Sequence, residues 1–103
     1  MITNEKNQYN NRQLKAMRDK IQSYLNAQIT LGDLINDLEA LLDCMGEVDA
    51  LWEKKFRVTW GRLEDVYSFS IYEKKTTFDK EDKREIDDAI QQILYLISSF
   101  EEK

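Results

Sequence analysis

The spacing of apolar residues along the chain predicts four helices joined by short polar links. In four segments, apolar side chains recur every three or four positions, which is the period of a helix with one buried face. We expect these helices at about 11–27, 31–45, 50–72 and 80–101. The apolar positions that carry the pattern are Leu14, Met17, Ile21, Tyr24 and Leu25; Leu31, Leu34, Ile35, Leu38, Leu41, Leu42 and Met45; Trp52, Phe56, Trp60, Leu63, Val66 and Tyr67; and Ile86, Ala89, Ile90, Ile93, Leu94, Ile97 and Phe100.

The third segment also has a second apolar stripe, formed by Leu51, Val58 and Phe69 about a third of a turn from the first. A helix that is apolar over so much of its circumference needs neighbours on two sides. We therefore predict an all-α fold, a single-domain four-helix bundle with a long central third helix. Part of the second stripe could also be covered in a homodimer.

Polar residues at the segment ends fit helix caps. Thr30 with Asp33 resembles a capping box, Asp79 with Asp82 suggests another cap, and Asp49 is expected to cap the third helix. Gly46 follows the second segment, where a left-handed residue often ends a helix.

Gly61 lies inside the third segment, where glycine costs up to about 1 kcal/mol relative to alanine. A neighbouring helix that crosses closely would explain it.

Chain length and composition indicate one helical domain. The 103 residues contain no proline and only three glycines, which favours long helices. Residues 1–10 are polar and are predicted to form a flexible N-terminus, with the helical domain at 11–103. The single cysteine, Cys44, is expected to be a buried apolar residue at the core edge, and it fits a reducing compartment. Because no leader or membrane-spanning stretch is visible, we expect a soluble cytoplasmic protein with no membrane partner.

The residue types present argue against an enzyme. Histidine is absent, which excludes Ser-His-Asp and Cys-His arrangements and the histidine-containing di-iron sites of helical bundles. The acidic run at 79–88 lacks the glycine that a calcium loop requires. We expect no catalytic residue, no metal site and no cofactor, although magnesium chemistry on carboxylates alone stays open as a remote alternative.

Charge is distributed unevenly along the chain. The net charge is −5, yet residues 21–53 contain seven acids and no lysine or arginine. Such a stretch is either a solvated helix face, partly neutralised by bases of the third helix, or a docking surface for a basic protein. The candidate partner-binding residues are Asp33, Asn36, Asp37, Asp43, Glu47 and Asp49.

The basic residues do not indicate nucleic-acid binding. Lys54, Lys55, Arg57 and Arg62 cluster on the third helix, but acids flank them and the chain is acidic overall. Pairing with the acidic second helix is the better interpretation.

The run from Leu31 to Ile71 resembles a family of small all-helical bacterial proteins in which a leucine-rich helix leads into the motif V-D-x-x-W-x-x-x-F-x-x-x-W-x-x-L-E-x-x-Y, here Val48 to Tyr67, and the family's usual tail is similar to Phe78–Phe100. Every position of that motif is filled here, and the resemblance extends over about 70 residues. Proteins of this kind include immunity partners of contact-dependent or polymorphic toxins. The resemblance thus implies an immunity or antitoxin protein that binds a basic toxin domain. The alternative is a helical adaptor or homodimeric module without a toxin partner.

Overall fold

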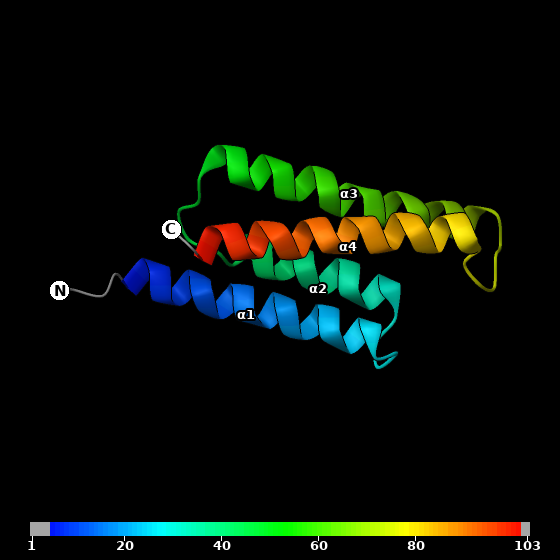
Figure 1. Ribbon diagram of the computed structural model, residues 1–103, viewed down its shortest axis with the longest axis horizontal. Helices are drawn as coiled ribbons and strands as arrows, with labels where there is room; N and C mark the ends of the chain where they lie inside the picture. The colour runs from blue at the N-terminus through cyan, green and yellow to red at the C-terminus, as the bar shows by residue number, and fades with distance from the viewer. Residues whose placement is uncertain (1–4, 102–103) are drawn as a thin grey trace.

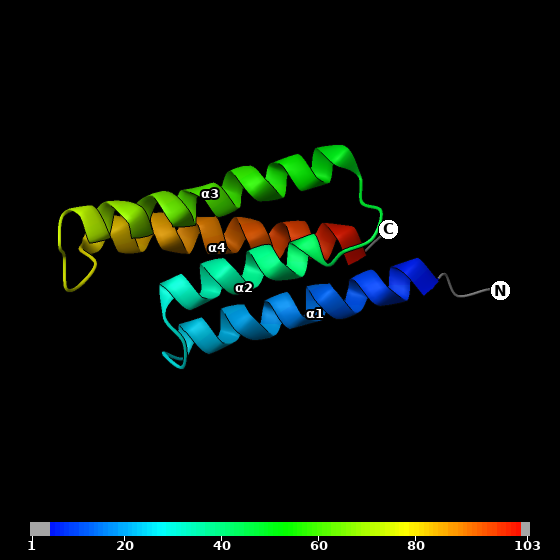
Figure 2. The same ribbon diagram turned by 180° about the vertical axis from the view of Figure 1, so that it is seen from behind.

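A computed structural model describes residues 5–101, with side chains described for residues 8–100. It contains four α-helices: α1 (Glu5–Leu25), α2 (Leu31–Asp43), α3 (Ala50–Tyr72) and α4 (Lys80–Glu101). Figure 1 shows two antiparallel hairpins, α1–α2 and α3–α4, and Figure 2 shows the same arrangement from behind. The predicted four-helix bundle is confirmed, and α3 is its longest helix.

The core is built from the predicted apolar faces. Phe56 and Leu63 of α3 are fully buried, as are Leu14 of α1, Leu34 of α2 and Ile93 of α4. Leu96 of α4 is also buried although we did not expect it, and Leu25 of α1 is exposed although we expected it inside.

Two tryptophans connect α3 to neighbours on either side. The indole N–H of Trp52 donates to the backbone oxygen of Leu96 in α4, at 2.8 Å. The indole N–H of Trp60 donates to the backbone oxygen of Ile35 in α2, at 2.9 Å. Both bonds satisfy a polar atom on a side chain that otherwise packs against apolar neighbours. They also fix the position of α3 relative to α2 and α4.

The second apolar stripe of α3 is not covered by either neighbour. Leu51, Val58 and Phe69 are 59%, 63% and 53% exposed. The expectation that this stripe packs inside the domain is therefore wrong. It faces outward because α2 and α4 contact the side of α3 that carries Trp52, Phe56 and Leu63.

Three helix N-termini are capped as the sequence predicts. Thr30 Oγ1 accepts from the Asp33 backbone N–H and Asp33 Oδ2 accepts from the Thr30 backbone N–H, both at 3.1 Å, which closes a capping box. Asp49 Oδ2 accepts from the Trp52 backbone N–H at 2.9 Å. Before α4, Asp79 Oδ1 accepts from the Asp82 backbone N–H at 2.9 Å.

The start of α1 corrects a prediction. The helix begins at Glu5 rather than near Asn11, so the described part of the segment expected to be flexible, 5–10, is helical. Met1–Asn4 lie outside the described residues. Asn10 is buried, with 1% of its surface exposed. Its Oδ1 accepts from the Gly46 backbone N–H at 2.8 Å, and its Nδ2 donates to the Glu47 backbone oxygen at 3.3 Å. Asn10 thus connects α1 to the α2–α3 link.

Glycine does not supply the left-handed residues of this fold. No described glycine has a positive φ, so the prediction for Gly46 is wrong. The left-handed positions after α1 and α3 are Ala27, at φ 61°, and Lys74, at φ 54°. In each case the next residue donates a hydrogen bond back into the last turn, from Gln28 to Ser23 and from Lys75 to Ser70. The helices end in Schellman-type turns without the usual glycine.

Two helical glycines have opposite surroundings. A Cβ built at Gly32, in α2, would lie 2.8 Å from Tyr67 Oη and 2.9 Å from Tyr67 Cζ. A Cβ built at Gly61, in α3, would meet nothing within 4 Å. The close helix crossing expected at Gly61 is therefore absent within the domain, and it is Gly32 that has a close neighbour, the Tyr67 side chain of α3.

We expect alanine to have opposite effects at these two glycines. Gly32→Ala should lower the free energy of unfolding by up to about 2 kcal/mol, because moving the half-buried Tyr67 ring costs more than alanine gains in helix propensity. Gly61→Ala should raise it by up to about 1 kcal/mol, because alanine is the better helix former. Urea titration followed by circular dichroism, at low protein concentration, measures both. Changes of the same sign would contradict the assigned packing.

Candidate functional site

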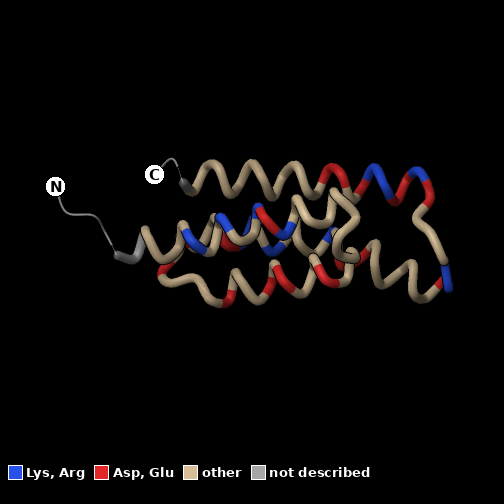
Figure 3. Tube along the Cα trace, turned by 90° about the horizontal axis from the view of Figure 1, so that it is seen from below, with Lys and Arg blue, Asp and Glu red and all other residues tan. Residues whose placement is uncertain are grey.

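The predicted partner-binding residues lie along α2 and in the link that follows it. Figure 3 shows acidic and no basic positions along this helix. We define the acidic face as the predicted set of Asp33, Asn36, Asp37, Asp43, Glu47 and Asp49. The first four lie on the outer side of α2, opposite Leu34 and Leu38, while Glu47 and Asp49 continue the surface beyond the end of the helix. Asp37 is half-buried and the other five are exposed.

Two members of the acidic face already have a structural role. Asp33 closes the capping box of α2, and Asp49 caps α3. Their carboxylates are therefore held in place by backbone N–H groups. Each retains lone pairs that can accept further hydrogen bonds, since a carboxylate has about four acceptor sites.

Two other members form ion pairs with neighbouring helices. Lys20 Nζ of α1 lies 3.5 Å from Asp37 Oδ2, and Arg57 Nη2 of α3 lies 3.1 Å from Asp43 Oδ1. Arg57 also bonds Glu53 at 2.9 Å. Hydrogen bonds to Glu53 and then to Asp43 raise the pKa of Arg57 above its ordinary value. Of the four bases of α3 expected to pair with α2, Arg57 does so, whereas Arg62 pairs with Glu85 of α4. The ion pair of Lys20 with Asp37 was not predicted.

These ion pairs leave the acidic face accessible. All four side chains are more than a third exposed, and ion pairs of that kind contribute only about 0–1 kcal/mol each. A basic surface on another protein could therefore replace Lys20 and Arg57 at little cost. Chemically, the face can accept hydrogen bonds from arginine and lysine and can accelerate association with a positively charged partner.

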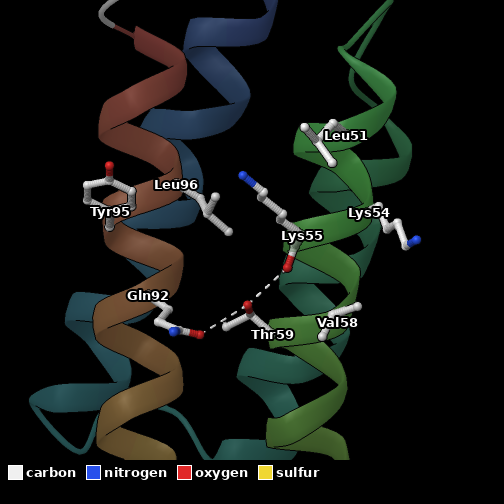
Figure 4. A pocket seen from close by; sticks show the side chains of 8 residues that line it. All are labelled: Leu51, Lys54, Lys55, Val58, Thr59, Gln92, Tyr95 and Leu96. Atoms are coloured by element: carbon white, nitrogen blue, oxygen red, sulfur yellow. Dashed lines mark hydrogen bonds between the residues drawn. The ribbon is translucent and has the colours of Figure 1, made fainter.

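A second surface feature lies between α3 and α4. A groove of about 410 Å³ is lined from α3 by Leu51, Lys54, Lys55, Val58 and Thr59 and from α4 by Gln92, Tyr95 and Leu96. Figure 4 shows these side chains and the Thr59 hydroxyl between the Lys55 backbone oxygen, at 2.9 Å, and Gln92 Oε1, at 3.4 Å. Tyr95 is 72% exposed. The groove is an apolar strip with two lysines beside it.

Sequence reasoning did not identify this groove. The exposure of Leu51 and Val58 depends on which side of α3 its neighbours take, and the pattern of apolar residues alone does not determine that. Tyr95 could not be recognised as part of a groove from the sequence, because it lies on the outer side of α4, away from the predicted core face.

Cys44 also differs from its expected position. It ends α2 as the residue after Asp43, and it is exposed rather than buried at the core edge. Cys44 keeps helical backbone angles, and at 100° per residue it falls on the outer side of α2 with Asp33 and Asp37, so its exposure follows from the helix period. Within the part of the chain described, no three side chains of the types that bind metals lie close enough to hold an ion.

Comparisons with known proteins give no relative. No protein-family model, no curated protein and no solved structure matches the chain. The resemblance to small helical bacterial proteins is therefore a prediction and not an assignment. Among the described residues, no helix has both the length and the apolar character that crossing a membrane requires.

Proposed function

We propose that this protein acts by binding, without chemistry of its own, and that the acidic face of α2 docks on a basic protein. The observation that carries the proposal is the outer side of α2, where carboxylates gather without a basic residue on the same helix. A field of one sign draws in an oppositely charged partner, and paired charges then fix its orientation.

The partner that fits best is a toxin domain with a basic substrate-binding surface. A nuclease-type toxin must hold phosphate, and its active site is positively charged for that reason. An acidic helix laid across that surface would block substrate entry. The resemblance of Val48–Tyr67 to families that include immunity proteins supports the same proposal. The protein would be an immunity or antitoxin protein that works by occlusion.

The structure suggests which charges to test. Asp33 and Asp49 cap helices, so reversing them would also damage the fold. Asp37 and Asp43 have no such role, and their ion pairs lie at the surface. Reversal of Asp37 and Asp43 to lysine therefore changes the acidic face with the least effect on folding.

We expect the Asp37→Lys, Asp43→Lys variant to lose a basic partner that the wild-type protein retains. Like charges at an interface cost several kcal/mol, so affinity should fall roughly tenfold or more. The measurement is a pull-down from source-organism lysate, followed by titration of the purified partner by calorimetry. The captured protein should be toxic when expressed alone, and wild-type protein should suppress that toxicity.

A matched control is available on α4. Asp87 and Asp88 are exposed, and their reversal to lysine changes the net charge by the same amount. This control should retain the partner. Equal retention by the α2 and α4 variants would show that the acidic face is not the interface, and a captured partner that is neither basic nor toxic would contradict the toxin proposal.

A second candidate function rests on a different observation. The exposed apolar residues of α3 favour a helical adaptor or homodimeric module. That surface lies on another helix from the acidic face, so self-association and toxin binding do not exclude each other.

A further inference from the structure

Six residues lie on the outer side of α3, which faces away from the core. We define this outer face of α3 by Leu51, Lys54, Val58, Gly61, Asp65 and Phe69. At 100° per residue, they fall within an arc of about 80°. All except Gly61 are exposed, and Gly61 is half-buried.

No contact within the described domain accounts for glycine at position 61 of the outer face. It interrupts the longest helix, it has no positive φ, and a Cβ at this position would meet open space. Neither backbone conformation nor packing within the monomer requires glycine here. A glycine in the middle of an exposed helix face is what close approach of a second helix requires.

The two charged residues of the outer face, Lys54 and Asp65, also form no ion pair or hydrogen bond with any side chain in the described part of the domain. Arg62, beside them, points toward α4. It bonds Glu85 at 2.7 Å and Gln92 at 3.1 Å, and its hydrogen bond lowers the pKa of the Glu85 carboxyl. The available charges of the outer face are therefore one base and one acid, which lie on opposite sides of Gly61.

We propose that the outer face of α3 binds the same face of a second copy, antiparallel and centred near Gly61. In that register Lys54 lies opposite Asp65 of the second copy, and Asp65 lies opposite its Lys54. Leu51 lies opposite Phe69, and each Val58 approaches the other copy's Gly61. Leu51 and Phe69 meet at both ends of the interface, and these two contacts lie about 27 Å apart along the helix.

The antiparallel direction follows from the charges. A parallel pair would place Lys54 against Lys54 and Asp65 against Asp65, which is repulsive. The antiparallel pair makes two opposite-charge contacts related by a two-fold axis, as an isologous dimer requires. Phe69 of the second copy then lies beside the groove between α3 and α4, where Leu51 and the exposed Tyr95 provide apolar contacts.

The first test is the mass of the wild-type chain in solution. Sedimentation equilibrium at physiological ionic strength should give a concentration-dependent mass that rises from 12.3 kDa toward twice that value. A mass that stays at 12.3 kDa up to millimolar concentration would overturn the proposal. A complex larger than a dimer would also overturn the proposal, because a two-fold interface uses the same face on both copies and leaves none for a third.

Charge reversal then tests the register. Lys54→Glu alone and Asp65→Lys alone should each weaken dimerisation roughly tenfold or more, because each variant places two like-charge pairs in its homodimer. An equimolar mixture of the two variants should form a heterodimer, since both contacts become opposite-charge pairs again. Native mass spectrometry separates the heterodimer from either homodimer. A mixture that stays monomeric would overturn the proposal.

Two further variants separate the interface from effects on folding. Gly61→Gln improves helix propensity and meets open space in the monomer, yet its side chain blocks a close crossing. We expect it to remain folded by circular dichroism and to lose the dimer. Lys15→Glu and Asp19→Lys, on exposed positions of α1, are matched charge controls that should dimerise like wild type. A Gly61→Gln protein that dimerises normally would overturn the proposal.

Discussion

Phe56→Ala is expected to lower the free energy of unfolding by about 3–5 kcal/mol, the usual cost of truncating a buried phenylalanine. Phe56 is fully buried in α3, and its ring centroid lies 5.4 Å from that of Trp52. Truncation therefore leaves a cavity at the centre of the bundle and removes an aromatic contact. For a domain whose total stability is about 5–15 kcal/mol, this loss is large. Urea or thermal unfolding followed by circular dichroism measures it.

Phe69 provides a control of the same residue type on the same helix. Phe69 is 53% exposed, and Lys75 Nζ lies 5.4 Å from its ring centroid. An exposed cation–π contact is worth about 0.5–1 kcal/mol. We therefore expect Phe69→Ala to cost no more than that at a concentration where the protein is monomeric. Equal losses for Phe56→Ala and Phe69→Ala would contradict the orientation of α3.

Asn10→Ala should lower the free energy of unfolding by about 1–3 kcal/mol although the residue is polar and near the N-terminus. Its side-chain amide accepts a hydrogen bond from the Gly46 N–H and donates one to the Glu47 carbonyl. Alanine would remove both hydrogen bonds that the buried Asn10 amide makes, and the loss of bonded polar groups in a partly buried place costs about 1–3 kcal/mol. The same unfolding experiment measures this change.

Asn11 is the natural control for Asn10. It is the next residue along α1 and is exposed. Surface substitutions away from special features usually change stability by less than about 0.5 kcal/mol, and alanine favours the helix. No loss for Asn10→Ala would show that the contact between α1 and the α2–α3 link is not needed for stability. An equal loss for Asn11→Ala would show that the effect is not specific to that contact.

The fold class could be predicted because the apolar period and the caps agree. Thr30 with Asp33, and Asp49, are local signals whose geometry depends on a few neighbouring residues, and both caps form as expected. The start of α1 was predicted wrongly because Asn10 is polar and its partners are about 36 residues away in the chain. A buried polar residue with distant backbone partners resembles a surface residue in the sequence.

The glycines were misread for a related reason. Glycine indicates either a left-handed backbone or a close approach, and the sequence does not say which. Gly46 has neither the expected positive φ nor a tight contact, whereas Gly32 meets Tyr67 of α3. The residues with left-handed backbone are Ala27 and Lys74. Alanine and lysine seldom adopt that conformation.

The exposure of the candidate residues could be predicted from the sequence, but only part of their ion pairing could. Exposure of the acidic face follows from helix periodicity, since Asp33, Asn36 and Asp43 alternate with buried leucines. The pairing of Asp37 with Lys20 depends on how α1 packs against α2, which periodicity does not give.

The two indole hydrogen bonds of α3 also provide intrinsic optical probes. Trp52 is bonded across the α3–α4 contact and Trp60 across the α3–α2 contact, so each fluorophore reports on a different boundary of the same helix. Emission from a protein that retains only one of them would respond to the opening of that boundary alone. Motions within the α3–α4 hairpin could then be followed in real time separately from motions between the hairpins, without any attached dye.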